Sequence, residues 1–81
     1  PTLDIGYFEL ALCYAEKNDG DNSLKYIDRA ISIAPDNPDY YDFRAALYYI
    51  RGETIKAEED VKKCKQLGGK AENASKFSTS E

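Results

Sequence analysis

The sequence repeats itself with a fixed period of about 34 residues, and this periodicity restricts the possible folds more than any other feature. The matched pairs are Tyr7 and Tyr41, Ala11 and Ala45, Tyr14 and Tyr48, Ser23 and Ala57, Ile27 and Val61, and Ala30 and Cys64. A fixed period of this length is typical of repeat architectures, in which neighbouring units stack to bury apolar faces that one unit cannot bury alone. The stretch Pro35-Asp36-Asn37-Pro38 separates the two units.

Two helices are expected in the first unit. The first, over 4–17, is apolar on nearly all sides, and we expect Asp4 to cap its N-terminus. A helix without a polar face is normally buried on several sides. The turn-forming residues 18–22 follow, and an amphipathic pattern predicts a second helix over 22–34, which Pro35 ends.

Two further helices are expected in the second unit. The third helix, over 38–51, is rich in aromatic residues and has Asn37 as its expected cap, with a proline in its first turn. Gly52 suits the left-handed conformation that often follows a helix. Thr54 is the expected cap of a fourth helix over 55–67.

The last twelve or so residues differ in composition from the rest of the chain. From Lys70 onward the residues are small or polar, and Phe77 is the only large apolar one. This composition predicts a polar tail over 70–81 that forms a short helical turn and is otherwise disordered. The triplet Asn73-Ala74-Ser75 has the form of a glycosylation sequon, but such triplets are common by chance and we expect it to be unused.

Composition limits the classes of partner. The 81 residues suffice for one small domain, and their net charge of −4 argues against a nucleic-acid partner. No apolar run is long enough to span a membrane, so no membrane association is expected. The chain begins at Pro1 and contains no methionine, so we expect it to be a piece of a longer protein.

The sequence contains little that could carry catalysis. It has no histidine, which removes the commonest general base and metal ligand. Cys13 and Cys64 lie on apolar helical stripes far apart in the sequence, which favours free thiols and a reducing compartment such as the cytoplasm. We therefore expect no enzyme activity, no metal and no cofactor.

One short stretch has the spacing of a calcium loop. Asp19, Asp21 and Ser23 match its first three ligands. However, Leu24 stands where that loop needs glycine, and Ala30 stands where it needs a bidentate glutamate. A solvated turn is the better interpretation.

The repeating residues resemble the tetratricopeptide repeat, a helix–turn–helix unit with the same period. The first unit supplies Tyr7, Leu10, Ala11, Tyr14, Ser23, Ile27, Ala30 and Pro35, and the second Tyr41, Ala45, Tyr48, Gly52, Ala57, Val61 and Cys64. The second unit departs from the pattern at Arg44, where the family has Leu, and at Gly69, where it has Pro. The resemblance implies an all-α fold: two hairpins, over 4–37 and 38–69, forming a short right-handed α-solenoid within a domain over 1–69.

The resemblance also implies a protein–protein interaction module, an adaptor or scaffold whose first helices line a concave groove for a peptide or helix. The groove-facing residues would be Ile5, Phe8, Leu12, Glu16, Asp39, Asp42, Ala46, Tyr49 and Ile50. Apolar residues would form the floor of this groove, with Asp39 and Asp42 at one edge. Such a surface suits an amphipathic helix or an extended peptide with apolar anchors and a basic residue.

The apolar first helix also fits a second hypothesis, self-association into a homodimer. In that case Ile5, Phe8 and Leu12 would be core residues, buried by another copy of the chain or by a missing repeat. Gly6, Cys13 and Leu10 would face a preceding unit if one exists.

One known mode of binding in the family is not expected here. Some tetratricopeptide proteins clamp the acidic C-terminal tails of heat-shock chaperones with Lys, Asn and Arg. This chain has Phe8, Leu12, Asp39 and Asp42 on the corresponding wall, and the two carboxylates would repel an acidic tail.

Overall fold

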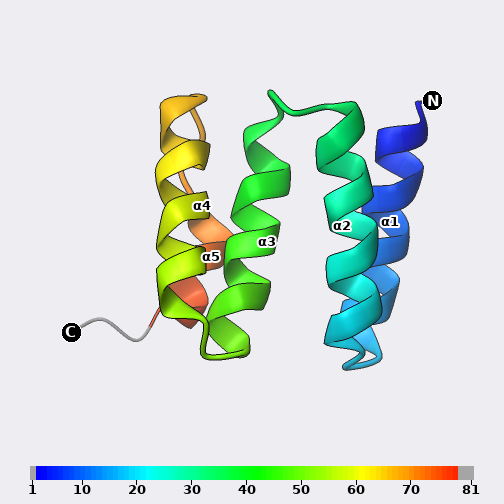
Figure 1. The fold of residues 1–81 in the computed structure, drawn as a ribbon, viewed down its shortest axis with the longest axis horizontal. Coiled ribbons are helices and arrows are strands. Elements are labelled where there is room, and N and C mark those ends of the chain that lie inside the picture. Colours follow the sequence, from blue (N-terminus) through cyan, green and yellow to red (C-terminus); the bar gives the residue numbers. More distant parts are fainter. Residues whose placement is uncertain (1, 79–81) are drawn as a thin grey trace. The chain divides into compact units, whose positions relative to one another are not determined.

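The computed structural model describes residues 2–78, and within that range the chain is helical throughout, without strands (Figure 1). The helices are α1 (Leu3–Glu16), α2 (Gly20–Ile33), α3 (Pro38–Ile50), α4 (Thr54–Gln66) and α5 (Glu72–Phe77). The chain divides into two compact units between Asp36 and Asn37. The predicted all-α class is confirmed. No helix in the described range has the length and apolar character needed to cross a membrane.

In the first unit, α1 packs against α2 through small residues. Ala11, Ile27 and Ala30 are fully buried. The Ser23 hydroxyl, also fully buried, donates a hydrogen bond of 2.7 Å to the Ala11 carbonyl oxygen. Small side chains allow the close approach of the two helices, and this bond satisfies a polar group that would otherwise be costly to bury.

The helix starts in the first unit differ from the prediction. Thr2, not Asp4, is the N-cap residue of α1, and Asp4 lies buried within the first turn, where it accepts a hydrogen bond from the Thr2 hydroxyl. The second helix starts at Gly20 rather than Asn22, because Asp19 caps it: the Asp19 carboxylate accepts the backbone N–H of Asn22 at 3.1 Å.

The turn inside each hairpin is the same, although the sequences of the two turns differ. Asn18 has a φ of 61°, and Gly52, at the equivalent position of the second unit, has a φ of 81°. In each turn, the amide of the next residue donates to a carbonyl five residues earlier: Asp19 to Tyr14 at 2.9 Å, and Glu53 to Tyr48 at 2.9 Å. Asparagine and glycine are the residues that adopt this left-handed conformation most readily.

In the second unit, α3 packs against α4 around the buried Ala45 and Ala57. The predicted cap of α3 is confirmed: the Asn37 side chain accepts the backbone N–H of Asp39 at 2.9 Å, and Pro38 opens the helix. The prediction for α4 is wrong by one residue. Thr54 is the first helical residue, and Glu53 holds the N-cap position without a side-chain cap bond.

The segment expected to be a polar tail with a short helical turn contains a fifth helix of six residues. Gly68, with a φ of 94°, follows the end of α4. The chain then turns back along the second unit, and α5 packs against α3 (Figure 1). Ala71 and Ala74 are buried there, with exposed fractions of 3% and 1%. Residues 79–81 of the expected tail lie outside the described range.

Candidate protein-binding site

The groove residues expected on α1 present an apolar surface that the first hairpin does not cover. Ile5 is 45% exposed and Leu12 is 39% exposed. Phe8 is half-buried and Glu16 is exposed. Burial of these residues by another copy of the chain or by a missing repeat, the second expectation, stays a prediction.

A different side of α1 was expected to face a preceding unit. Its residues are Gly6, Leu10 and Cys13. All three are exposed, Leu10 at 42%. Because only one side of α1 packs against α2, apolar residues are left on the remaining circumference of the helix. This is the physical consequence of a helix with no polar face.

On α3 the expected groove residues divide into an exposed set and a buried set. Asp39 and Ile50 are exposed, Ile50 at 62%, whereas Asp42 and Ala46 are each only 6% exposed. Tyr49 is half-buried. Asp42 was expected at the edge of an open groove; the structure instead buries it beneath α5.

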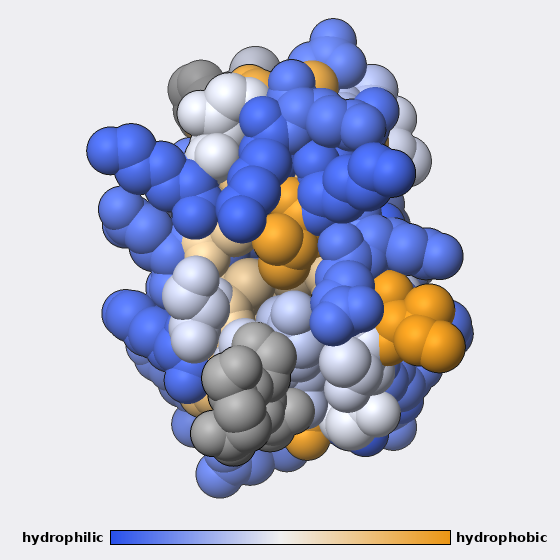
Figure 2. Space-filling model, turned by 90° about the vertical axis from the view of Figure 1, so that its left-hand side faces the viewer, coloured by the Kyte–Doolittle hydropathy of each residue, from blue (hydrophilic) through white to orange (hydrophobic). Residues whose placement is uncertain are grey.

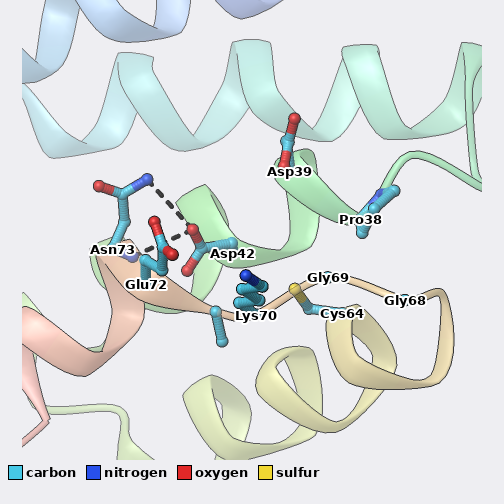
Figure 3. A pocket seen from close by; sticks show the side chains of 10 residues that line it. Pro38, Asp39, Asp42, Cys64, Gly68, Gly69, Lys70, Glu72 and Asn73 are labelled. Atoms are coloured by element: carbon cyan, nitrogen blue, oxygen red, sulfur yellow. Dashed lines mark hydrogen bonds between the residues drawn. The ribbon is translucent and has the colours of Figure 1, made fainter.

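Asp42 caps the N-terminus of α5. One carboxylate oxygen accepts the backbone N–H of Asn73 at 3.1 Å and its side-chain amide at 3.1 Å, and the other accepts the backbone N–H of Ala74 at 2.8 Å (Figure 3). The residue before α5, Ala71, has left-handed dihedral angles and gives the helix no side-chain cap. Thus α3 supplies the hydrogen-bond acceptor that the first turn of α5 lacks.

The same bonds bear on the sequon. The Asn73 side-chain nitrogen, the atom to which a glycan would be attached, donates to Asp42 within a helix. The use of the sequon stays untested by this contact, because a glycosylated amide nitrogen keeps one hydrogen that it can donate.

A cavity of about 330 Å³ lies beside this contact, between the start of α3 and the segment that leads into α5. Figure 3 shows Asp39, Asp42, Lys70 and Cys64 among its lining residues. Burial raises the pKa of the Cys64 thiol above its ordinary value of 9.0, and the Asp42 and Asp39 carboxylates raise it further. The thiol is therefore protonated at neutral pH and is not an activated nucleophile.

A second cavity, of about 190 Å³, lies where α5 meets α3 and α4. Tyr49, Val61 and Lys65 line it on one side, and Ala74, Ser75 and Ser78 line it on the other. The side chains of α5 therefore leave part of the surface beneath the helix unfilled. Figure 2 shows the side of the molecule that lies to the left in Figure 1: hydrophilic residues cover most of it, and hydrophobic residues are visible near its centre and at its right edge.

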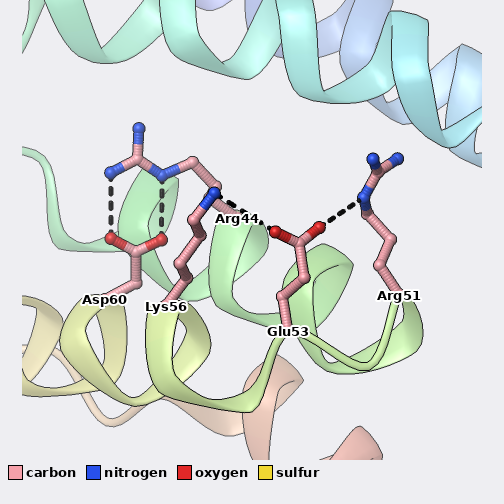
Figure 4. Close-up of polar contacts among 5 residues, drawn as sticks. All are labelled: Arg44, Arg51, Glu53, Lys56 and Asp60. Atoms are coloured by element: carbon pink, nitrogen blue, oxygen red, sulfur yellow. Dashed lines mark hydrogen bonds and ion pairs between the residues drawn. The ribbon is translucent and has the colours of Figure 1, made fainter.

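Arg44 and Asp60 form a polar contact that the repeat pattern did not predict. The Arg44 guanidinium donates to both Asp60 carboxylate oxygens, at 2.8 and 2.9 Å (Figure 4). Its central carbon also lies 5.7 Å from the ring centroid of Tyr41 and 5.8 Å from that of Tyr48. The departure from Leu at Arg44 was visible in the sequence, but its partner on α4 was not.

The first unit fills the corresponding space with an aromatic ring. Tyr26, which occupies the repeat position of Asp60, stacks on Tyr7 and Tyr14, with ring centroids 6.0 and 5.6 Å apart. The Arg29 guanidinium lies 5.3 Å from the Tyr26 ring. The first hairpin thus fills the space between its two helices with a stacked aromatic ring, and the second fills it with a cation that lies against two rings.

Two carboxylates precede α2 and α4 and have lowered pKa values. Hydrogen bonds from the Asn22 side chain and backbone hold the pKa of Asp19 below its ordinary value of 3.8. Hydrogen bonds from Arg51 and then Lys56 hold the pKa of Glu53 below its ordinary value of 4.5 (Figure 4). Both carboxylates are thus charged at neutral pH.

The calcium interpretation of the first turn finds no support in the geometry. Both Asp19 carboxylate oxygens accept hydrogen bonds from Asn22, at 3.1 and 2.8 Å. Across residues 2–78, no three or more Cys, Asp or Glu side chains are grouped so that they could hold a metal ion.

Comparisons of the chain with models of known protein families, with curated proteins and with solved structures give no match.

Proposed function

We propose that this chain is a protein–protein interaction module, built from two tetratricopeptide-type hairpins that stack as a short right-handed α-solenoid. The recurrence of local structure at the period of the sequence repeat supports this. Asn18 and Gly52 adopt the same left-handed turn, and Ala11 and Ala45 are both fully buried. A sequence period that reappears as a structural period is the signature of a repeat protein.

The observation that carries the function is the uncovered apolar surface of α1, here called the α1 face (Ile5 and Leu12). These two residues are seven positions apart, which places them on one side of the helix, and they are 45% and 39% exposed. Exposed apolar residues that share one side of a helix mark sites of protein interaction. Glu9 and Glu16, which are also exposed on α1, favour a partner helix or peptide that carries basic residues beside its apolar anchors.

The same observation favours one alternative, in which the α1 face pairs with that of a second copy. A homodimer would bury the apolar residues equally well. It would also bring Glu9 and Glu16 of one copy near the same residues of the other, which costs free energy through like-charge repulsion. This cost is the reason to place the adaptor before the homodimer.

The oligomeric state separates the two. We would measure absolute mass by light scattering behind a sizing column over a concentration series, for the natural chain and for Leu12→Asp. A monomer at all concentrations supports the adaptor, whereas a dimer that Leu12→Asp dissociates supports self-association. A monomer that Leu12→Asp unfolds would contradict both, because Leu12 would then be needed within the chain.

A selection experiment tests the adaptor directly. A display library of helical peptides would be selected on the natural chain, and the enriched peptides tested against Leu12→Asp. Ile55→Asp is the matched control, because it makes the same kind of change at a side chain of α4 that is 75% exposed. Enrichment of peptides with apolar anchors and basic residues, lost with Leu12→Asp and kept with Ile55→Asp, is the expected result. Peptides that bind Leu12→Asp equally well would place the site elsewhere.

A further inference from the structure

We propose that the surface beneath α5 is a helix-docking site, and that α5 is an internal occupant that a partner helix displaces. This surface, here called the α5 seat, consists of Asp42 and Tyr49 on α3 and Val61 and Lys65 on α4. The proposal rests on the proposed interaction function, and it names the class of partner and the regulation of the second unit.

The polar end of the seat recognises the start of a helix. Asp42 is 6% exposed and directs both carboxylate oxygens at the first turn of α5. A buried carboxylate is costly unless hydrogen-bond donors surround it, and the open N–H groups of a helix N-terminus are such donors. The positive end of the helix dipole adds to the attraction. The seat therefore selects a helix that lacks an N-cap residue of its own, as α5 does.

The apolar part of the seat selects small side chains. Ala71 and Ala74 are 3% and 1% exposed and lie three residues apart, which places them on one side of the chain where α5 begins. Each has only a methyl group, so larger residues at these two positions would collide with the seat. The partner is thus a helix that begins with two small residues separated by two others.

As an occupant, α5 is weakly held. It has six residues and is about 9 Å long, whereas α3 has thirteen residues and is about 20 Å long. A helix this short is not stable alone, and the left-handed Ala71, with a φ of 54°, adds strain because the residue has a Cβ. Phe77, the one large apolar residue of α5, is 44% exposed and so buries little apolar surface against the second unit.

A longer helix has surface still to gain. The cavity of about 190 Å³ beside Ala74 and Ser75 can accept a larger apolar side chain than the serine. Tyr49 on α3 and Val61 on α4, which line this cavity, are only half-buried and so have surface left to cover. The expected partner therefore has small residues in its first turn and a Leu-sized residue in its second.

The test is a titration of the full chain with a fluorescent helical peptide about twice as long as α5. The peptide begins Ala-Glu-Asn-Ala and has Leu at the position of Ser75. Ala74→Asp releases α5, because its carboxylate cannot be buried in the seat, and leaves every residue of the seat unchanged. We expect it to bind the peptide at least about tenfold more tightly than the natural chain does, because α5 no longer competes.

Three further variants complete the test. Ala71→Gly removes the left-handed strain, strengthens α5 and should weaken peptide binding about threefold. Asp42→Ala in the Ala74→Asp background removes the acceptor and should abolish the gain in affinity. Lys76→Gln changes an exposed residue of α5 and should bind as the natural chain does. Hydrogen exchange of the Ala74 amide reports the release of α5, and circular dichroism reports the other four helices.

The proposal is overturned if Ala74→Asp releases α5 but binds the peptide no better, or if Asp42→Ala makes no difference. Should Ala74→Asp unfold the second unit, the Ala71→Gly variant still decides, since unchanged or tighter binding contradicts competition. Leu12→Asp should leave this titration unchanged. A failure here therefore concerns only the α5 seat, whereas a failure of the α1 face appears only in the Leu12→Asp experiments.

Discussion

A single repeat position can be filled by two different chemistries, as Asp60 and Tyr26 show. In the first hairpin Tyr26 stacks on two tyrosine rings of α1, and in the second the Arg44 guanidinium lies against two tyrosine rings of its own helix. Asp60 occupies the position that Tyr26 occupies in the first hairpin, and its carboxylate accepts two hydrogen bonds from the guanidinium. Arginine can do this because its flat cation accepts a carboxylate at its edge and aromatic rings at its faces.

This difference can be tested by placing the residues of the first hairpin at the equivalent positions of the second. Arg44→Leu leaves Asp60, whose side chain is only 8% exposed, without its charged partner and should cost about 1.5–3 kcal/mol. Adding Asp60→Tyr should recover most of that loss, because the pair then matches Leu10 and Tyr26 of the first hairpin. Urea unfolding of the two single variants and the double variant measures the coupling. Simply additive losses would show that the two hairpins do not share this design.

The two thiols should differ in reactivity. Cys13 is exposed, whereas Cys64 is 1% exposed and its pKa is raised above 9.0 by burial. With a thiol-reactive dye at neutral pH, we expect Cys64 to react about a hundredfold more slowly than Cys13, because only an opened second unit exposes it. Cys13→Ser should remove the fast phase and Cys64→Ser should keep it. Two equally fast phases would contradict the burial of Cys64.

At the scale of elements, the connection into α5 explains why a glycine stands at position 69. A Cβ built on Gly69 would lie 2.6 Å from the Cys64 sulfur and 2.8 Å from the Pro38 Cβ. The reason is steric, since Gly69 does not have a positive φ, unlike Gly68. The missing side chain is what lets the chain pass between α3 and α4 on its way to α5.

Two glycine-to-alanine substitutions should therefore act in opposite directions. Gly69→Ala should destabilise the chain by about 1–3 kcal/mol through overpacking. Gly6→Ala, in the middle of α1 with nothing within 4 Å of the added methyl group, should stabilise it by about 0.5–1 kcal/mol. Urea midpoints of both variants against the natural chain provide the measurement. A stabilising Gly69→Ala would mean that the connection does not follow this path.

The starts of α2 and α4 should make stability depend on pH. Because the folded-state pKa values of Asp19 and Glu53 are lowered, the unfolded chain binds their protons more readily than the folded chain does. Their contribution is complete well above the ordinary values of 3.8 for Asp19 and 4.5 for Glu53, and it is lost as the pH falls through the lowered folded-state values. The urea midpoint should therefore drop as the pH falls below about 5. Asp19→Asn with Glu53→Gln should flatten this slope; an unchanged slope would assign it to other carboxylates.

At the scale of the whole molecule, charge restricts the choice of partners. The net charge is −4, and Glu9, Glu16, Asp39 and Glu72 are all exposed. An acidic partner approaching either unit would meet like charges, whereas a basic amphipathic helix would be attracted. This agrees with the partner proposed for the α1 face.

An acidic C-terminal peptide should consequently fail to bind. We expect no saturable binding in a titration at low ionic strength, where electrostatic attraction would be strongest. The same peptide with its acidic residues changed to lysine serves as the matched control. Micromolar binding of the acidic form would contradict the charge argument and would require a basic site on this chain.

The sequence by itself determined the helices α1 to α4 and most of their boundaries. Apolar periodicity, the Asn37 cap and the left-handed Gly52 act within a few residues along the chain, so their effects could be predicted. Even the errors were local. Thr2 stands at the N-cap position expected for Asp4, and Asp19 caps α2 three residues before its expected start because its short side chain accepts an open backbone N–H.

Only the tertiary structure decided the rest. Asp42 meets Asn73 across 31 residues of sequence, and Arg44 meets Asp60 across 16. The six residues of α5 predicted no more than a short helical turn, because so short and polar a segment is not a stable helix alone. The helix forms because α3 supplies both the carboxylate that caps it and the surface that buries Ala74, and neither can be recognised from the segment alone.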